Sequence, residues 1–264
     1  MMFNELNQFI CSSLESHTSL QLAFSRSQLS NENISSVCQA LNQSINLKSL
    51  IFNFKTVQIS TQNLNNLIVS IGLCEKLQDL TLNLNNKKIG DEGISVIASA
   101  LKQCPKVIDL SILMIWNQIS DIGISNFSNQ LKDLTQLQQL NLNLSYNNIS
   151  DAGIIELSNS LKYCINVKKL VLKLCSNFFS DQGIYQLGNT MQFCSNIKIL
   201  QIQLKQNLIT NQGIKLFGTT LRKCNQIIVL IVNLKYNQQD FEVSQDLNIK
   251  FKKAIRLTTL KFDY

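Results

Sequence analysis

A repeat of 30 residues constrains this chain more than any other feature of its sequence. A fixed period of this length indicates a stack of similar units, because a single unit cannot bury its own apolar face and must share a core with its neighbours. The period is marked by leucines at Leu20, Leu50, Leu80, Leu110, Leu140, Leu170, Leu200, Leu230 and Leu260, and by glycines at Gly93, Gly123, Gly153, Gly183 and Gly213.

The first half of each unit has the pattern of a β-strand. Between Leu140 and Leu144 every second residue is leucine, and the residues between them are Asn141 and Asn143. A period of two places the leucines on one face of a strand and the amides on the other. The nine marker leucines therefore predict nine parallel strands, spaced roughly 4.8 Å apart.

The second half of each unit predicts an amphipathic helix that packs behind the strand. Ile154, Leu157 and Leu161 recur at helical spacing. They follow Ser150 and Asp151, whose hydroxyl or carboxylate can cap the first turn. The aspartates at this position in other repeats, and the glycines two residues after them, are expected to have structural roles at the helix starts: capping for the aspartates and close packing for the glycines.

The aligned units share the pattern Leu137-x-x-Leu140-x-Leu142-x-Leu144-x-x-Asn147-x-Ile149. This resembles the leucine-rich repeat of the ribonuclease-inhibitor-like class, with one further x-Leu pair before the asparagine, and it covers residues 20–264. The resemblance implies an α/β solenoid, a curved horseshoe with a parallel sheet on the concave side and helices on the convex side. We expect a single domain over residues 1–264, with a helical cap at 1–19, repeats at 20–256 and a terminal strand at 257–264, whose open edge is a place where another chain could associate.

An asparagine follows most of the strands and resembles the buried asparagine ladder of that family, whose amides satisfy backbone groups in the turn after each strand. Lys87 breaks the ladder. The ladder positions are Asn117, Asn147, Asn177, Asn207 and Asn237.

The composition is that of a folded chain, with 45% hydrophobic and 16% charged residues. Its apolar runs, such as residues 110–116, are strand-sized, shorter than the ~18 residues that a membrane span needs. The N-terminus lacks the basic flank and apolar core of a secretory signal. These features predict a cytoplasmic protein, with the nucleus as the alternative. The formal charge of +7 is scattered over the repeats, so no specific nucleic-acid site is expected.

Five of the eight cysteines are expected to be buried, reduced thiols of the core. They share one repeat column with Leu134, which is typical of core positions, and adjacent repeats hold that column roughly 8–10 Å apart, beyond disulfide reach. These five are Cys74, Cys104, Cys164, Cys194 and Cys224. Cys175 differs, because its place in the strand pattern puts it on the inner surface as the candidate reactive thiol.

The sequence contains no recognisable combination of catalytic residues. The single histidine, His17, lies before the first strand and is expected to be a surface or cap residue. It leaves no nucleophilic triad or histidine-based metal site, and no glycine loop has phosphate-binding spacing. We therefore expect no enzymatic activity, metal or cofactor.

The inner face of the sheet is the predicted binding surface, since repeat arrays bind partners there. Most of its residues are neutral and polar, but Leu113 and Ile115 are apolar, and Trp116 follows with Tyr146 and Tyr236 in its column. Aromatic anchors among amides are typical of interface centres, although Trp116 could instead pack on its own turn. Lysines are expected to stack in one inner column and attract an acidic partner segment. The predicted partner contacts are Leu113, Ile115, Trp116, Asn143, Tyr146, Lys173, Lys205, Lys235 and Tyr236.

The predicted function is that of a non-catalytic scaffold or adaptor for another protein, whose identity the pattern does not give. Two alternatives stay open at this stage. A branch with similar repeats activates GTPases through residues on early loops, and Arg26 is the arginine so placed. The chain could also be the recognition arm of a larger, kinase-linked protein.

Overall fold

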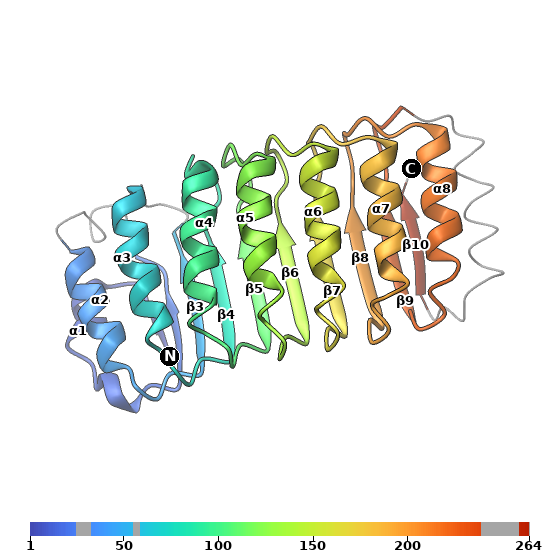
Figure 1. Ribbon diagram of the computed structural model, residues 1–264. Helices are drawn as coiled ribbons and strands as arrows, with labels where there is room; N and C mark the ends of the chain where they lie inside the picture. Colours follow the sequence, from blue (N-terminus) through green and yellow to red (C-terminus); the bar gives the residue numbers. More distant parts are fainter. Residues whose placement is uncertain (25–32, 55–58, 239–258, 264) are drawn as a thin grey trace.

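The computed structural model describes residues 1–24, 33–54, 59–238 and 259–263, and for the last range only the backbone is described. Strands and helices alternate along the chain (Figure 1). The strands are β1 (Met2–Phe3), β2 (Ser19–Leu22), β3 (Ser49–Asn53), β4 (Asp79–Asn83), β5 (Asp109–Leu113), β6 (Gln139–Asn143), β7 (Lys169–Lys173), β8 (Ile199–Gln203), β9 (Val229–Asn233) and β10 (Thr259–Asp263).

Each described helix crosses from one strand to the next. The helices are α1 (Leu6–Ile10), α2 (Ile34–Gln43), α3 (Thr61–Gly72), α4 (Gly90–Leu101), α5 (Asp121–Leu131), α6 (Asp151–Leu161), α7 (Asp181–Met191) and α8 (Asn211–Leu221), with a short 3-10 helix, η1, at Leu14–Ser16. Arg26 and the last predicted helix, before β10, lie outside the described residues.

The strands form one parallel sheet in sequence order, from β1 to β10. The register follows the repeat: Leu80 pairs with Leu50 on one side and with Leu110 on the other. Because residues 30 apart are neighbours in space, any column of the sequence alignment is also a line of adjacent side chains across the sheet. The predicted nine-strand parallel sheet is confirmed over β2–β10, and β10 pairs with β9 alone.

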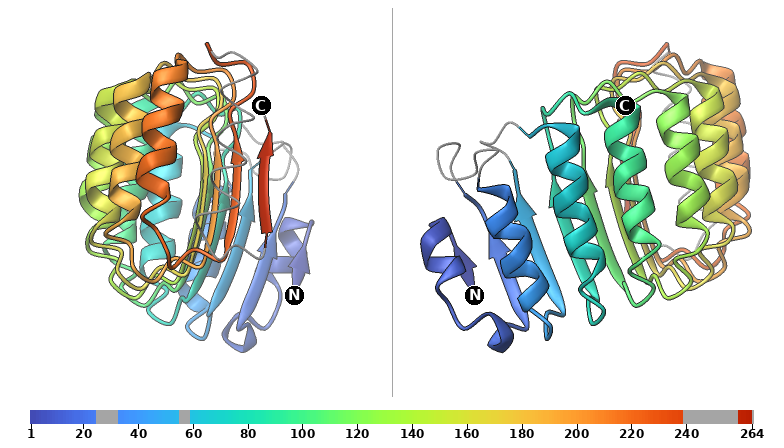
Figure 2. Two further views of the ribbon diagram at one scale, coloured as in Figure 1. Left: turned by 90° about the vertical axis from the view of Figure 1, so that its right-hand side faces the viewer. Right: turned by 60° about the vertical axis from the view of Figure 1, so that its left-hand side comes forward.

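Two layers make up the molecule, and the core lies between them. Helices α2–α8 cover one face of the sheet, and none of these helices lies on the other face (Figure 2). We call this uncovered side the open face; it is the inner face of the predicted horseshoe. The leucines of the strands point toward the helices, as in β6, where Leu140 and Leu142 are 1% exposed. No helix within the described residues is long and apolar enough to cross a membrane.

The N-terminal segment contains one element that the sequence pattern did not predict. Besides the helices α1 and η1, it forms β1, which pairs in parallel with β2. His17 is buried in this cap, with Phe3 at 5.5 Å between ring centroids and the Ser12 hydroxyl 2.8 Å from Nε2. Of the two placements expected for His17, the cap is therefore correct and the surface is wrong.

The aspartates at the helix starts act across the repeats. Asp151 heads α6, but its Oδ1 accepts the backbone N–H groups of Ser180 and Gly183, and its Oδ2 accepts the Ser180 hydroxyl. The side-chain cap of α6 itself is Ser150, which accepts from the backbone N–H of Ala152. The structural role predicted for the aspartates is correct, but each one acts on the start of the next helix. The same contacts to Ser or Thr recur at Asp91, Asp121 and Asp181.

The glycines of the same region are explained by these carboxylates. A Cβ atom on Gly183 would lie 2.6 Å from Asp151 Oδ1, closer than non-bonded atoms tolerate. Gly123, Gly153 and Gly213 would meet Asp91, Asp121 and Asp181 in the same way. Glycine therefore leaves space for the aspartate of the preceding repeat, which confirms close packing as the reason for the glycine column.

The asparagine ladder forms as predicted. Asn177 donates from Nδ2 to the carbonyls of Leu144 and Leu174, and its Oδ1 accepts the N–H of Ile149. One amide thus ties two turns together, as Asn117, Asn147, Asn207 and Asn237 also do. Lys87 occupies the same column and is only 7% exposed. Burial lowers the pKa of its ammonium.

The cysteine column is part of the core. All eight cysteines are free thiols, and the five column members are buried. Burial raises the pKa of Cys74 and Cys104 to about 11 and that of Cys164, Cys194 and Cys224 to about 12. The expected reduced, structural thiols are confirmed.

Candidate functional site

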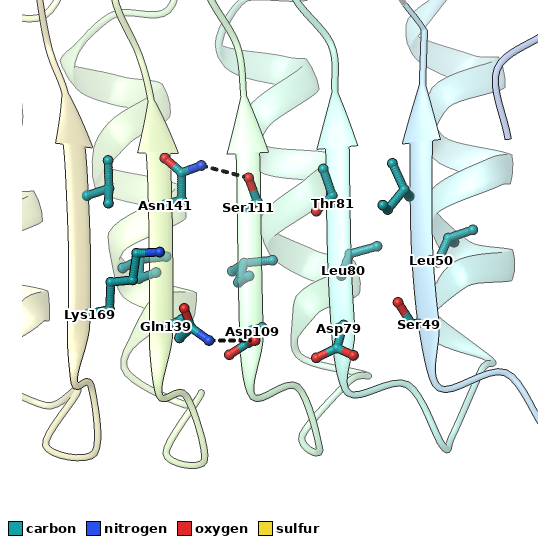
Figure 3. Close-up of a pocket in the computed structure, with 14 residues that line it drawn as sticks. Ser49, Leu50, Asp79, Leu80, Thr81, Asp109, Ser111, Gln139, Asn141 and Lys169 are labelled. Atoms are coloured by element: carbon teal, nitrogen blue, oxygen red, sulfur yellow. Dashed lines mark hydrogen bonds between the residues drawn. The ribbon is translucent and has the colours of Figure 1, made fainter. Parts of the chain in front are cut away.

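The open face of the sheet holds a shallow hollow over strands β3–β7 (Figure 3). Its volume is about 370 Å³. Side chains on its surface bind one another along the columns: Asn141 Nδ2 donates to Ser111 Oγ at 2.9 Å, and Gln139 Nε2 donates to Asp109 Oδ2 at 2.8 Å. The exposed residues that line the hollow are mostly polar, and none of the predicted contact residues is among them.

Two carboxylates and one lysine line this hollow. Asp79 and Asp109 are register partners on adjacent strands. Partial burial and, to a smaller extent, the neighbouring Asp79 raise the pKa of Asp109, while Lys169 and the bond from Gln139 oppose the rise. The hollow could therefore accept a cationic or amide-rich group.

The predicted contacts on the strands differ in how much they offer a partner. Leu113 is the last residue of β5, Ile115 follows two residues later, and both are half-buried. Asn143, the neighbour of Leu113 on β6, is only 8% exposed, and its Oδ1 accepts the N–H of Ser145. Asn143 can therefore present little surface, contrary to its place among the predicted contacts.

The predicted lysines do not share one column. Lys173 pairs with Gln203 and lies in the column of Leu113 and Asn143. Lys205 and Lys235 lie two residues further along their repeats, beyond the ends of β8 and β9. The expectation of a single stack of three is wrong, because a shift of two residues moves a side chain one place along the same face of the sheet.

The loops after the strands form a second surface. We call it the loop ridge and define it as residues 85–88, 115–118, 145–148, 175–178, 205–208 and 235–238. The second residue of every loop has a left-handed backbone, with φ between 53° and 59°, a conformation that costs energy for any residue with a Cβ atom. These residues are Asn86, Trp116, Tyr146, Ser176, Gln206 and Tyr236. Lys88 and Gln118, the last residues of the first two loops, are left-handed as well.

Trp116 and Tyr146 form a stacked pair on the ridge. Their ring centroids are 4.6 Å apart with an interplanar angle of 12°, and Trp116 is 56% exposed. The structure brings together these two predicted contacts. Trp116 does not fold back onto its own turn; it lies against the next loop and keeps most of its surface open.

A groove runs beside the stacked pair. Its volume is about 490 Å³. Phe178, which is 58% exposed, lines it together with the two rings. The sequence analysis did not single out Phe178, although its column, with Gln118, Asn148 and Leu208, follows from the same repeat. The residues that line the groove are Asn86, Lys88, Trp116, Gln118, Tyr146, Asn147, Asn148, Ser176 and Phe178.

Tyr236 and Lys205 form a second aromatic contact, three loops further on. The Lys205 Nζ lies 4.6 Å from the centroid of the Tyr236 ring, a cation–π geometry. Tyr236 is highly exposed. This pair presents an aromatic surface and a positive charge at one place.

The charged residues of the ridge are all positive. Its residues include Lys87, Lys88, Lys205 and Lys235 and no Asp or Glu. The aspartates that follow the ridge, such as Asp121, direct their carboxylate oxygens to the next repeat. The ridge is therefore positive, in contrast to the hollow at the other end of the strands.

Cys175 does not fit the role of a reactive thiol. It is half-buried, and burial raises its pKa, which lowers the fraction of reactive thiolate at neutral pH. Cys11 in the N-terminal cap is exposed instead. Among the described residues no three His, Cys, Asp or Glu side chains are grouped as a metal site would need.

Comparison with known proteins identifies the repeat. A family model described as "Leucine Rich repeat" matches residues 73–98 and 140–158. An internalin C2 structure from Listeria monocytogenes has 20% identity and a TM-score of 0.45, over 84% of this chain and 74% of that one. A structure of leiomodin-1 actin-binding site 2 has 15% identity and a TM-score of 0.43, over 62% and 86%. At these levels neither structure indicates what this chain binds. No curated protein matches it significantly.

Proposed function

Because the chain is a leucine-rich-repeat protein, we propose that it is a non-catalytic scaffold, which binds another protein through the open face of its sheet and the adjoining loop ridge. The observation that carries the proposal is the stacked pair of Trp116 and Tyr146, held open to solvent on a rigid array. Exposed aromatic rings of this kind are enriched at the energetic centres of protein interfaces.

The chemistry of the described side chains supports binding more than catalysis. The thiols of the cysteine column have raised pKa values, so they are poor nucleophiles at neutral pH. The aspartates at the helix starts are occupied by hydrogen bonds to the neighbouring repeat. Leu113 and Ile115 extend the apolar surface from the ridge onto the sheet.

The test is affinity capture from a lysate of the source cells, with the wild-type chain compared with Leu113→Asp/Trp116→Ala. A matched control is Tyr185→Asp, which also places a charge on an exposed side chain, but on helix α7 behind the sheet. Circular dichroism and urea denaturation must show that all three proteins are folded. We expect one protein to be captured by the wild type and by Tyr185→Asp and to be lost with the double variant.

Capture of the same protein by the double variant would exclude the open face and ridge as the binding surface. Capture of nothing by the wild type would count against the scaffold function itself. In that case stimulated GTP hydrolysis would be measured for the wild type and for Arg26→Ala, since the alternative function depends on that arginine.

A further inference from the structure

We propose that the loop ridge binds an extended acidic peptide segment, one apolar side chain of which lies in the groove formed by Trp116, Tyr146 and Phe178. This inference rests on the proposed function and specifies the chemistry of the partner. It is carried by three observations: the backbone conformation of the ridge, the composition of the groove, and the placement of the lysines.

The backbone of the ridge favours small or amide residues, yet it carries large aromatic ones. A residue in the left-handed region pays roughly 1–2 kcal/mol unless it is Gly, Asn or Asp. Asn86 has this conformation in the loop before Trp116, and Trp116 and Tyr146 adopt it with φ of 59° and 58°. Bulky residues in a conformation that disfavours them are typical of functional positions. The conformation also directs both rings outward, where they stack.

The groove combines an apolar floor with polar walls. Trp116, Tyr146 and Phe178 supply three exposed aromatic faces, while Gln118 and Asn148 supply amides at its edge. An apolar side chain can desolvate on the rings, and side-chain amides can donate to and accept from the backbone of a peptide. The volume of about 490 Å³ is within the range of ordinary ligand pockets and accommodates a side chain with its adjacent backbone.

The lysines set the charge and the spacing of the partner. Lys88 lines the groove itself, and Lys205 and Lys235 lie two and three loops beyond Tyr146. At ~4.8 Å per strand these distances are roughly 10 and 14 Å, which an extended peptide covers in about three and four residues. A carboxylate three or four residues from the apolar anchor would therefore meet a lysine. The ridge carries no Asp or Glu to oppose it.

An acidic peptide fits this surface better than a nucleic acid does. Lys88 is exposed, and Lys205 and Lys235 are half-buried on two adjacent loops. Three loops that carry neutral residues only separate Lys88 from Lys205. Proteins that track a phosphate backbone present a continuous run of cations. One lysine in the groove and two more on loops beyond it instead match a segment with one apolar residue and a few carboxylates.

The test uses a phage-displayed library of random 12-residue peptides, selected on the full chain. We expect the enriched peptides to be net negative, with an apolar residue three or four positions from a carboxylate. The variant that removes the aromatic anchor is Trp116→Asn. Asparagine is chosen because Asn86 adopts the same left-handed backbone in its own loop. The enriched peptides should bind it at least about tenfold more weakly than the wild type, the loss expected when a central aromatic anchor is removed.

The charge requirement is tested with Lys205→Glu/Lys235→Glu. Its control is Lys198→Glu/Lys223→Glu, which makes the same change in net charge at exposed positions outside the ridge. The ridge variant should lose at least about tenfold in affinity, and the control should lose less than about threefold, since remote charges are screened. Trp116 is the only tryptophan, so its fluorescence reports directly on the groove during these titrations.

Several outcomes would overturn the inference. The selection could enrich neutral or basic peptides, or no peptides at all. The enriched peptides could bind Trp116→Asn as tightly as the wild type. A 12-nucleotide oligothymidylate could also bind the chain more tightly than the peptides do and lose the same affinity in the lysine variant. The proposed function fails independently of these results. If a lysate partner is lost with Leu113→Asp alone while Trp116→Asn still captures it, the scaffold function stands and the peptide site on the ridge does not.

Discussion

Lys87 stands in the column of the asparagine ladder, and the residue is buried, with only 7% of its surface exposed. The ladder asparagine of the next repeat shows what an asparagine would do there: Asn117 donates to the carbonyl of Leu84, 33 residues earlier. The corresponding carbonyl for residue 87 belongs to Phe54. A buried ammonium group costs more solvation energy than an amide that is hydrogen-bonded on both sides.

We expect Lys87→Asn to raise the free energy of unfolding at pH 7 by about 1 kcal/mol, because a neutral amide loses less solvation energy than an ammonium group at this buried position. The gain should depend on pH. Burial holds the pKa of Lys87 below 10.5 in the folded chain, so between that lowered pKa and 10.5 the unfolded chain binds more protons than the folded one, and the wild type becomes more stable as pH rises. The advantage of the variant should therefore shrink toward pH 10.

Urea denaturation at pH 7 and pH 10 measures this difference, with the exposed Lys106→Asn as the control for lost charge. All other titratable groups are present in both proteins, so their contributions cancel in the difference. An advantage that stays constant with pH would show that the Lys87 ammonium is not destabilised by burial.

Neighbouring repeats are joined at the starts of their helices by Asp151 and Gly183. The carboxylate of Asp151 accepts three hydrogen bonds from α7 and the residue before it. Gly183 provides the space for it, since a Cβ would lie 2.6 Å from Oδ1. The two residues belong to different helices but form one joint, so their effects on stability should not be independent.

Gly183→Ala should destabilise the wild type by about 1–3 kcal/mol, the usual cost of overpacking. In the Asp151→Ala background the same substitution should cost less, by at least about 1 kcal/mol, because the clashing oxygen is gone. Denaturant midpoints for the four proteins of this cycle give the coupling energy, and Asp133→Ala, at an exposed site, controls for the lost charge. Simple additivity would mean that the carboxylate is not the reason for glycine.

The sequence predicts the type and order of the helices and strands better than it predicts the hydrogen-bond partners of their side chains. The periods of two and 3.6 identified the strands and helices, since they follow from which residues are buried. The acceptor set of Asp151 could not be predicted, because it depends on how closely two helices approach. The strand β1 could not be predicted either, because its residues precede the first repeat and have no aligned counterpart. The aromatic column was found from its spacing, but the left-handed backbone that turns Trp116 outward was not.

The molecule as a whole is a line of repeats, so its stability varies along its length. Each repeat contacts only its neighbours, which allows local opening at one place while others stay closed. The cysteine column samples this line at five repeats, and its thiols are buried with pKa values of about 11–12. Cys11, in the cap, is exposed.

Alkylation with iodoacetamide at pH 8, followed by mass spectrometry of each peptide, should therefore divide the cysteines into classes. Cys11 is expected to react at least about 100-fold faster than the column, whose thiols require opening of a repeat. Cys175 should lie between them. Fast modification of Cys164 or Cys194 in the native protein would show that the central repeats open far more readily than their packing implies.

The ridge and the core also differ in how freely their residues can be exchanged. A substitution of Leu140 or Asn177 disturbs the repeats on both sides of it. Trp116, Ser176 and Gln206 occupy the same backbone position in their loops, and their side chains point away from the core. Each loop is thus a separate place where mutation can alter recognition without breaking the fold. Over evolutionary time such a chain can change its binding partner through substitutions in one loop after another, while selection keeps the repeats themselves almost unchanged.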